Sequence, residues 1–182
     1  MRQTELVAAA ALCLVLALPA PARAALSLAG VDGITSTVLQ QDQSSFSGLA
    51  LRARVRSDAL VPQLVFMPTV EWWRSHSTID PYGIQATRKD AALGLDARWE
   101  FHAGATHPYA GGGFALHFLS SDVHSAALGL DETQSTMRGG LTALGGLEFP
   151  IGGHIANFFE VKYHHLPGAR QVKLNWGLSY GW

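Results

Sequence analysis

The 182-residue sequence predicts an all-β fold, a closed antiparallel up-and-down transmembrane β-barrel of about eight strands. Apolar and polar residues alternate with a period of two in repeated segments of about ten residues, as in strands that face lipid on one side and a lumen on the other. After residue 25 the sequence has no run of about 18 apolar residues, so we expect strands rather than helices to cross the membrane.

Residues 1–24 have the features of a cleaved secretory signal peptide. A short n-region with one arginine precedes the apolar stretch 6–18, and Ala22 and Ala24 place small residues before the expected cut. We therefore expect a signal peptide over 1–24 and a single β-barrel domain over 25–182. A retained N-terminal helix is the alternative.

Composition argues against several classes of protein. The only cysteine, Cys13, lies in the predicted signal peptide, so the mature chain would have no disulfide. Without the signal peptide, 11 basic side chains stand against 13 acidic ones, which argues against a nucleic-acid partner. No cofactor is expected.

The first three strands are assigned in order from the N-terminus. Residues 27–40 are needed for an even strand number, although two glycines and an aspartate blur their alternation. Residues 49–56 and 64–73 alternate more clearly. Pro68 interrupts the third strand, and because proline cannot donate to the ladder we expect a bulge or a locally unpaired position there.

Five further strands follow, and the last alternates most strictly. Residues 92–103 and 108–118 form the fourth and fifth, and the inward glycines of the fifth are expected to leave room for bulky neighbours. Residues 137–149 and 155–164 form the next two. In 172–182 every even position is large and apolar, which favours a barrel over a soluble edge strand.

The connections differ in length. Residues 57–62, 104–107 and 150–153 are short and contain turn formers, whereas 75–87 and 120–133 are longer and polar. The two kinds alternate along the chain, as short periplasmic turns and longer extracellular loops do in outer-membrane-type barrels.

Aromatic residues are expected on the lipid face at both membrane interfaces. Those expected near the periplasmic interface are Trp99, Phe101, Tyr109, Phe149, Tyr180 and Trp182. Those expected near the outer interface are Trp72, Phe118 and Tyr163.

The chain resembles a known family of membrane barrels. Its end, WGLSYGW, resembles the C-terminal strand signal of outer-membrane proteins, with Trp182 where phenylalanine is usual. Residues 108–114, after a strand that ends at 98–101, look like the central hairpin of small OmpA/OmpX-type barrels. The resemblance implies a bacterial outer-membrane location, contact with membrane lipid and lipopolysaccharide, and insertion by the barrel assembly machinery. The residues implied in recognition by that machinery are Trp176, Leu178, Tyr180 and Trp182.

Charged residues are concentrated on the predicted inward face. They are Arg52, Arg54, Arg56, Glu71, Asp96, Arg98, Glu100, Arg138, Glu148, Glu160, Lys162 and Lys173. Side chains fill the interior of an eight-stranded barrel, and isolated buried charges are costly. We therefore expect a lumen plugged by paired charges, with a narrow conductive path as the alternative.

Histidines raise the question of a metal or catalytic site. His102, His117 and His164 point inward by parity, but their heights are expected to differ and no short ligand spacing is present, so no metal is expected. Tyr163 to Ala169 look like the place where lipid A deacylase barrels carry His-x-Ser-Asn-Ala-Gly. Leu166 and Pro167 replace the serine and asparagine there, so the nucleophile is missing. The candidates for a catalytic base are His164 and His165.

The sequence thus predicts an outer-membrane barrel with a structural or surface-interaction role and an unidentified extracellular ligand. The alternatives are an outer-leaflet lipid-modifying enzyme, a narrow channel, and a soluble periplasmic barrel or lipid-binding sandwich. The long connections contain no recognisable motif.

Overall fold

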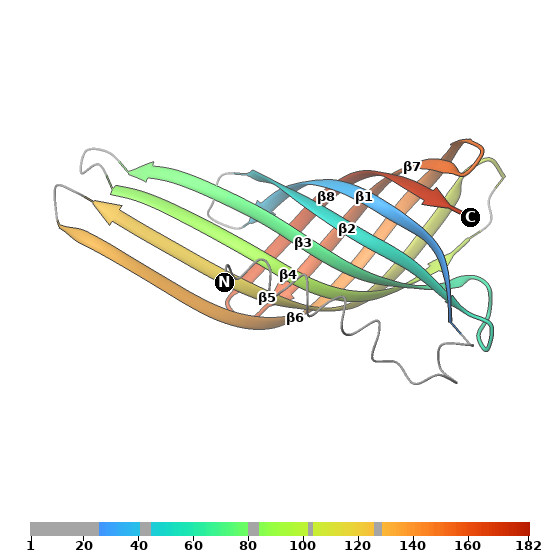
Figure 1. Cartoon of the computed structure of the whole chain (residues 1–182), viewed down its shortest axis with the longest axis horizontal. Helices are drawn as coiled ribbons and strands as arrows, with labels where there is room; N and C mark the ends of the chain where they lie inside the picture. The colour runs from blue at the N-terminus through green and yellow to red at the C-terminus, as the bar shows by residue number, and fades with distance from the viewer. Residues whose placement is uncertain (1–25, 41–44, 80–83, 102–103, 126–128) are drawn as a thin grey trace.

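The computed structural model is a closed barrel of eight antiparallel strands, and it describes residues 26–40, 45–79, 84–101, 104–125 and 129–182 (Figure 1). The predicted signal peptide lies outside these ranges. The strands are β1 (Leu26–Gln40), β2 (Phe46–Ser57), β3 (Leu64–Ile79), β4 (Ile84–Glu100), β5 (His107–Ser125), β6 (Leu130–Gly152), β7 (Ile155–Leu166) and β8 (Ala169–Gly181). Each strand pairs with the next, and β8 pairs with β1, which confirms the predicted fold class. Within the described ranges, no helix is long and apolar enough to cross a membrane.

β1 closes the barrel and confirms residues 27–40 as the first strand. Ile34 pairs with Ala50 of β2 on one side and with Gly177 of β8 on the other. Even-numbered residues from Gly30 to Val38 are buried in the lumen and odd-numbered ones are exposed. The alternation is therefore present, but Gly33 has no side chain to reveal it in the sequence.

Pro68 interrupts one ladder without shifting its register. The β2–β3 pairs stop at Arg52 with Thr69 and resume at Val55 with Phe66, and the numbering of the partners stays in step. On the other side Pro68 pairs with Leu95 of β4. Of the two predicted outcomes, the local loss of pairing is the one observed.

Strands β3 to β6 are much longer than the alternation predicted. They contain 16, 17, 19 and 23 residues, whereas β1, β2, β7 and β8 contain 12 to 15. The expectation that 75–87 and 120–133 are long loops is wrong, because most of these residues extend the strands. Both faces of the extensions carry polar side chains, so no period-two signal marks them.

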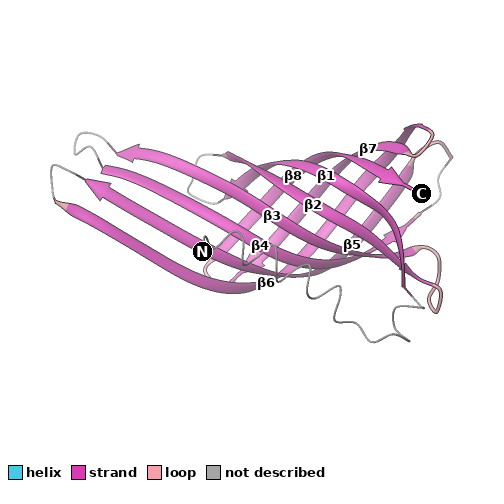
Figure 2. Ribbon diagram, viewed as in Figure 1, coloured by secondary structure: helices cyan, strands magenta, loops and turns pink. Residues whose placement is uncertain are grey.

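The extensions form a four-stranded sheet that projects beyond the rest of the barrel (Figure 2). Pairing of β2 with β3 begins at Gly48 and Trp73, and pairing of β6 with β7 begins at Leu141 and His165. The described parts of β3 beyond Trp73 and of β6 before Leu141 are therefore free edges. We call this part the projecting sheet, and the end that carries it the outer end.

Apolar side chains lie on the outer surface and charged side chains lie in the interior, which is the reverse of the distribution in a soluble protein. The exposed fractions of Leu51, Leu141 and Phe159 on the outer surface are 71%, 67% and 56%, while charged groups are buried in the lumen. The sequence places Tyr109 on the lipid face, and this is wrong. Tyr109 is buried in the lumen, where Gly146 makes room for it, since a Cβ there would lie 2.5 Å from the phenol oxygen.

Candidate functional site

Two arginines of β2 share one carboxylate in the middle of the lumen. Arg52 Nε and Arg54 Nε each lie 2.7 Å from an oxygen of Asp32 on β1. The same arginines reach across the barrel, where Arg52 Nη1 lies 2.8 Å from Glu160 Oε2 of β7 and Arg54 Nη1 lies 3.2 Å from Glu148 Oε1 of β6. These contacts join strands that are not neighbours, so the lumen is bridged.

A second group of charges lies toward the end opposite the projecting sheet. Arg98 Nη2 contacts Glu148 Oε2 at 3.0 Å and Glu100 Oε1 at 2.5 Å, and Arg56 Nη2 lies 2.6 Å from Glu100 Oε2. The Arg98 guanidinium also lies 4.4 Å from the centre of the Tyr109 ring, a cation–π distance. Arg56 is partly exposed, so this group extends to the opening of the lumen at the end opposite the projecting sheet.

A third group bridges the outer half of the lumen. Lys162 Nζ of β7 lies 2.9 Å from Glu71 Oε1 of β3 and 2.8 Å from Asp96 Oδ2 of β4. Lys173 of β8 also contacts Glu71, and the Thr142 hydroxyl donates to Asp96. All five side chains are buried. Each carboxylate is therefore partnered, as burial requires.

His117 and His164 meet in the lumen above this third group. His117 Nδ1 lies 2.6 Å from Asp90 Oδ2, and His117 Nε2 lies 3.2 Å from His164 Nδ1. The expectation that the histidine heights differ is wrong for this pair, because the tilted strands bring positions offset along β6 to the same level. His102 lies outside the described residues. No group of three or more His, Cys, Asp or Glu among the described residues is arranged to hold a metal.

The two candidate catalytic histidines face opposite sides of the barrel wall. His164 is buried in the lumen, whereas His165 is exposed on the outer surface beside Tyr163, with ring centres 6.5 Å apart. Among the described residues, neither makes a hydrogen bond to a hydroxyl or thiol. The described hydrogen bonds therefore join neither histidine to a nucleophile of the kind that a deacylase uses.

One predicted member of the charge network lies elsewhere, and several members were not predicted. Arg138 Nη1 donates to the Pro167 carbonyl at 3.0 Å in the β7–β8 turn, and within the described residues it forms no ion pair. This corrects its assignment to the lumen network. The members that sequence reasoning missed are Asp32, Asp90, Tyr109, Thr142 and Asn175. Strict alternation in β1 would have identified Asp32.

A cavity of about 340 Å³ opens at the outer end, at the foot of the projecting sheet. We call it the mouth cup. Its cationic residues are Arg88, Lys89 and Arg138, and its amides are Gln40, Gln134 and Gln171. Trp73, Leu119 and Leu166 form its apolar part. Lys89 donates to Asp122 at 2.9 Å, and this hydrogen bond lowers the pKa of the Asp122 carboxyl.

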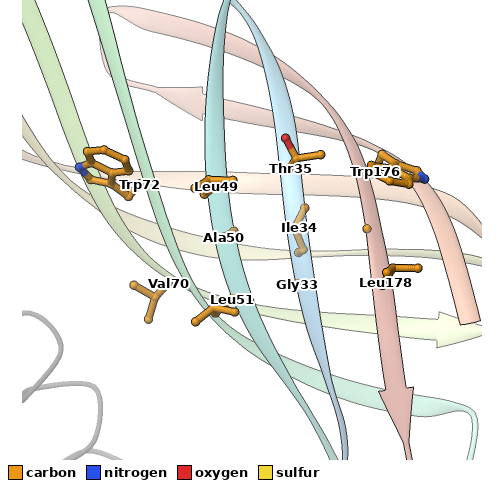
Figure 3. Close-up of a pocket in the computed structure, with 11 residues that line it drawn as sticks. Gly33, Ile34, Thr35, Leu49, Ala50, Leu51, Val70, Trp72, Trp176 and Leu178 are labelled. Carbon is orange, nitrogen blue, oxygen red and sulfur yellow. The ribbon is translucent and has the colours of Figure 1, made fainter. Parts of the chain in front are cut away.

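A larger groove, of about 640 Å³, lies on the outer surface over β8, β1, β2 and β3 (Figure 3). Strand pairing aligns Trp72, Leu49, Thr35 and Trp176 in one row and Val70, Leu51, Gly33 and Leu178 in the next. Gly33 forms the low point, and a Cβ there would meet nothing within 4 Å. The groove is almost wholly apolar, so it suits hydrocarbon contact and offers no chemistry.

Comparison with known proteins identifies the fold. No protein-family description and no curated protein matches the chain. Neisserial surface protein A matches with 16% identity over 86% of this chain and 99% of its own, with a TM-score of 0.56. Ail of Yersinia pestis, in complex with the heparin analogue sucrose octasulfate, matches with 15% identity over 85% of this chain and 100% of its own, with a TM-score of 0.57.

A major outer membrane protein from Thermus thermophilus matches with 13% identity over 85% of this chain and 99% of its own, with a TM-score of 0.64. The chain therefore has the OmpA/OmpX-type fold of small eight-stranded outer-membrane β-barrels. At these identities the comparisons show the fold alone.

Proposed function

We propose that this chain is a bacterial outer-membrane protein that binds a ligand at the cell surface through its outer end. The observation that carries the proposal is the projecting sheet, which extends four strands beyond the barrel and leaves edges of β3 and β6 unpaired among the described residues. Unpaired edges and polar faces are binding surfaces, and a protein that needed only a membrane anchor would not require them.

The outer surface supports placement in a membrane. Large apolar side chains are exposed on every strand of the barrel, whereas soluble proteins rarely expose a contiguous apolar surface of this extent. On this proposal residues 1–24 direct export across the inner membrane and are removed. Trp176, Leu178, Tyr180 and Trp182 then present the last strand to the assembly machinery, and the folded barrel contacts lipid and lipopolysaccharide.

Surface binding is better supported than the two other predicted roles, a narrow channel and a lipid-modifying enzyme. Charged side chains join β2 to β7 and β3 to β8 across the interior, which leaves a filled lumen rather than an open path. Thr142 pairs with His164 across β6 and β7, but its hydroxyl donates to Asp96, and no described hydrogen bond joins His164 or His165 to a hydroxyl. Nothing specific therefore favours an enzyme. The heparin analogue bound by Ail, which has this fold, supports a surface-binding role.

Orientation is tested by inserting an epitope tag at either end of the barrel. Gly129 lies in the β5–β6 turn and Gly104 in the β4–β5 turn, and both are exposed and have positive φ, of 62° and 65°. Antibody should label intact cells with the tag at Gly129, and label the Gly104 tag only after permeabilisation. The reverse pattern, or a tagged protein recovered in the soluble periplasm, would contradict the proposal.

Binding is tested by trimming the projecting sheet. Because His76 pairs with Thr87 and Asp122 with Thr133, residues 77–86 and 123–132 can each be replaced by Asn-Gly turns. Cells that display the full chain should attach to members of a panel of immobilised glycosaminoglycans and extracellular-matrix proteins. The trimmed variant, with its barrel intact, should lose most of this attachment. Equal attachment by both variants would contradict the proposal.

A further inference from the structure

We infer that the mouth cup is a binding site for one acidic sugar unit, a sugar ring that carries a carboxylate. The inference rests on the proposed function in one respect only, that the cup faces the exterior of the cell. The cup lies at the foot of the projecting sheet and includes Gln134 and Arg138 from the part of β6 whose edge is free. Three properties of the cup carry the inference: its shape, its charge and the polar groups left in its floor.

The shape suits a small ligand held from several sides. The volume of about 340 Å³ lies at the small end of the range for ligand sites, about 300–1,000 Å³. Gln40 of β1, Trp73 of β3, Gln134 of β6 and Gln171 of β8 all line it, so the walls come from around the whole barrel. A single sugar unit fits such a space, whereas the barrel below is closed by ion pairs.

The charge of the cup suits a carboxylate. No acidic residue is among its lining residues. Lys89 is engaged by Asp122, but among the described residues Arg88 and Arg138 form no ion pair. The Pro167 carbonyl holds Nη1 of Arg138 at 3.0 Å, which fixes the guanidinium and leaves its other N–H groups available. Arginine forks bind carboxylates in a bidentate manner, so these two residues are suited to the acid group.

The floor of the cup offers both a donor and an acceptor that have no partner among the described residues. Gln171 Nε2 donates to Gln40 Oε1 at 3.2 Å, but Gln171 Oε1 is buried without a hydrogen bond, and so is the indole N–H of Trp73. Buried polar groups are rarely left in this state. A sugar hydroxyl can both donate and accept, so it can satisfy either group, directly or through a water.

The same groups discriminate against a simple inorganic anion. Sulfate would engage Arg88 and Arg138 but has no proton to donate to Gln171 Oε1 at neutral pH. The unpartnered acceptor of Gln171 therefore favours a ligand that carries a hydroxyl group over an isolated sulfate.

The test is calorimetric titration of the purified, refolded full chain in detergent micelles. The probe is the disaccharide of glucuronic acid and N-acetylglucosamine, and the matched neutral probe is N,N′-diacetylchitobiose. We expect the acidic disaccharide to bind at least about tenfold more tightly than the neutral one, the difference made by one charge-assisted interaction. The double substitution Arg88→Gln with Arg138→Gln should abolish this preference.

Lys89→Gln is the control for net charge, because Lys89 adjoins the cup but lies on the outward face of β4, where its ammonium is already paired with Asp122. It should change affinity less than about threefold, as expected for an exposed pair. All variants are compared only after each shows the heat-dependent electrophoretic mobility of a folded barrel. Equal affinity for both disaccharides, unchanged binding by the double variant, or displacement by equimolar sulfate would each overturn the inference.

Acidic sugars occur both in the lipopolysaccharide of the same membrane and in glycans on other surfaces. Beads coated with hyaluronan distinguish the two, because intact cells should capture them only if the cup is free to bind from outside. If the purified chain binds the disaccharide but intact cells do not capture beads, the site stands and its source is the cell's own membrane. Antibody labelling of the tag at Gly129 tests the orientation of the barrel separately from ligand binding. Failure of the proposed function can therefore be distinguished from failure of the cup to bind an acidic sugar.

Discussion

At the scale of single residues, Glu71 carries the most demanding role in the lumen. It accepts contacts from Lys162 and Lys173, which come from the opposite wall of the barrel, and its side chain is largely buried. Lys162 has a second carboxylate in Asp96, but no other ion pair is formed by Lys173 within the described residues. Loss of the Glu71 charge would therefore leave one lysine buried and unpaired.

We expect Glu71→Gln to lower the free energy of unfolding by about 3–5 kcal/mol, the range for breaking one side of a buried ion pair. Urea unfolding in lipid vesicles, followed by tryptophan fluorescence, measures this loss. Lys89→Met breaks the exposed pair with Asp122 and should cost no more than about 1 kcal/mol. Losses of equal size in the two variants would show that burial of the lumen charges is not what makes them costly to break.

The Asp90–His117–His164 chain gives a second prediction of the same kind. His117→Leu leaves the Asp90 carboxylate buried without its hydrogen-bond partner, so the variant should be destabilised by at least about 1–3 kcal/mol. Adding Asp90→Leu removes the uncompensated charge, so the double variant should be more stable than His117→Leu alone. The same urea measurement decides it, and a double variant that is less stable than the single one would refute the role of His117 as the partner of the buried Asp90 carboxylate.

Parity in the sequence predicted which charged residues face inward but not which of them meet. Arg52 and Glu160 are separated by 108 positions and touch because β2 and β7 lie opposite each other at a register that no local pattern encodes. The tilt of the strands also brings His117 against His164, although the sequence led us to expect these two histidines at different heights along the barrel. Arg138 shows the converse, since it has inward parity yet lies beside a turn.

At the scale of elements, the close approach of β4 and β5 explains an inward glycine of β5. From the sequence we expected such glycines to leave room for bulky side chains. A Cβ at Gly113 would lie 2.1 Å from the Leu95 carbonyl oxygen and 2.6 Å from the Asp96 Cα. The obstacle is backbone, which cannot move aside as a flexible side chain can. Gly113 therefore permits the two strands to approach each other.

We expect Gly113→Ala to reduce sharply the fraction of chain that folds, because the added carbon forces the β4–β5 ladder apart. The fraction is measured after refolding into detergent, as the share that shows heat-dependent electrophoretic mobility. Gly33→Ala is the matched control, since a Cβ at Gly33 meets nothing within 4 Å. Normal folding of Gly113→Ala would contradict the close approach of the strands.

Among the elements, the sequence predicted best those that cross the membrane. Lipid on one side of β8 and the lumen on the other impose strict alternation, and Trp176, Leu178 and Tyr180 are all exposed outside while Asn175 and Ser179 are buried inside. The projecting parts of β5 and β6 have no such asymmetry. Residues such as Ser120, Ser135 and Thr136 face water or the polar cup on either side. Because apolar and polar residues do not alternate there, the sequence did not predict those parts as strands.

At the scale of the whole molecule, the barrel is held across its interior as well as around its wall. Arg52 joins β2 to β7, Lys162 joins β7 to β3, and Lys173 joins β8 to β3. The described side chains on the outer surface make no such contacts across the barrel, because they point away from the interior. An ion path through the lumen would require several of these buried contacts to break together.

We therefore expect no discrete conductance steps when the purified chain is inserted into planar lipid bilayers at neutral pH. Each broken buried contact costs about 3–5 kcal/mol, so a state with several broken at once would be too rare to carry current. Replacing Arg52, Glu160, Lys162 and Glu71 together by serine removes bridging side chains from the centre and the outer half of the lumen, and should produce steps if that variant inserts. Heat-dependent mobility of the reconstituted protein confirms insertion in both cases. Discrete steps from the unmodified chain would mean that the lumen conducts, and the narrow channel would then replace surface binding as the better account of this barrel.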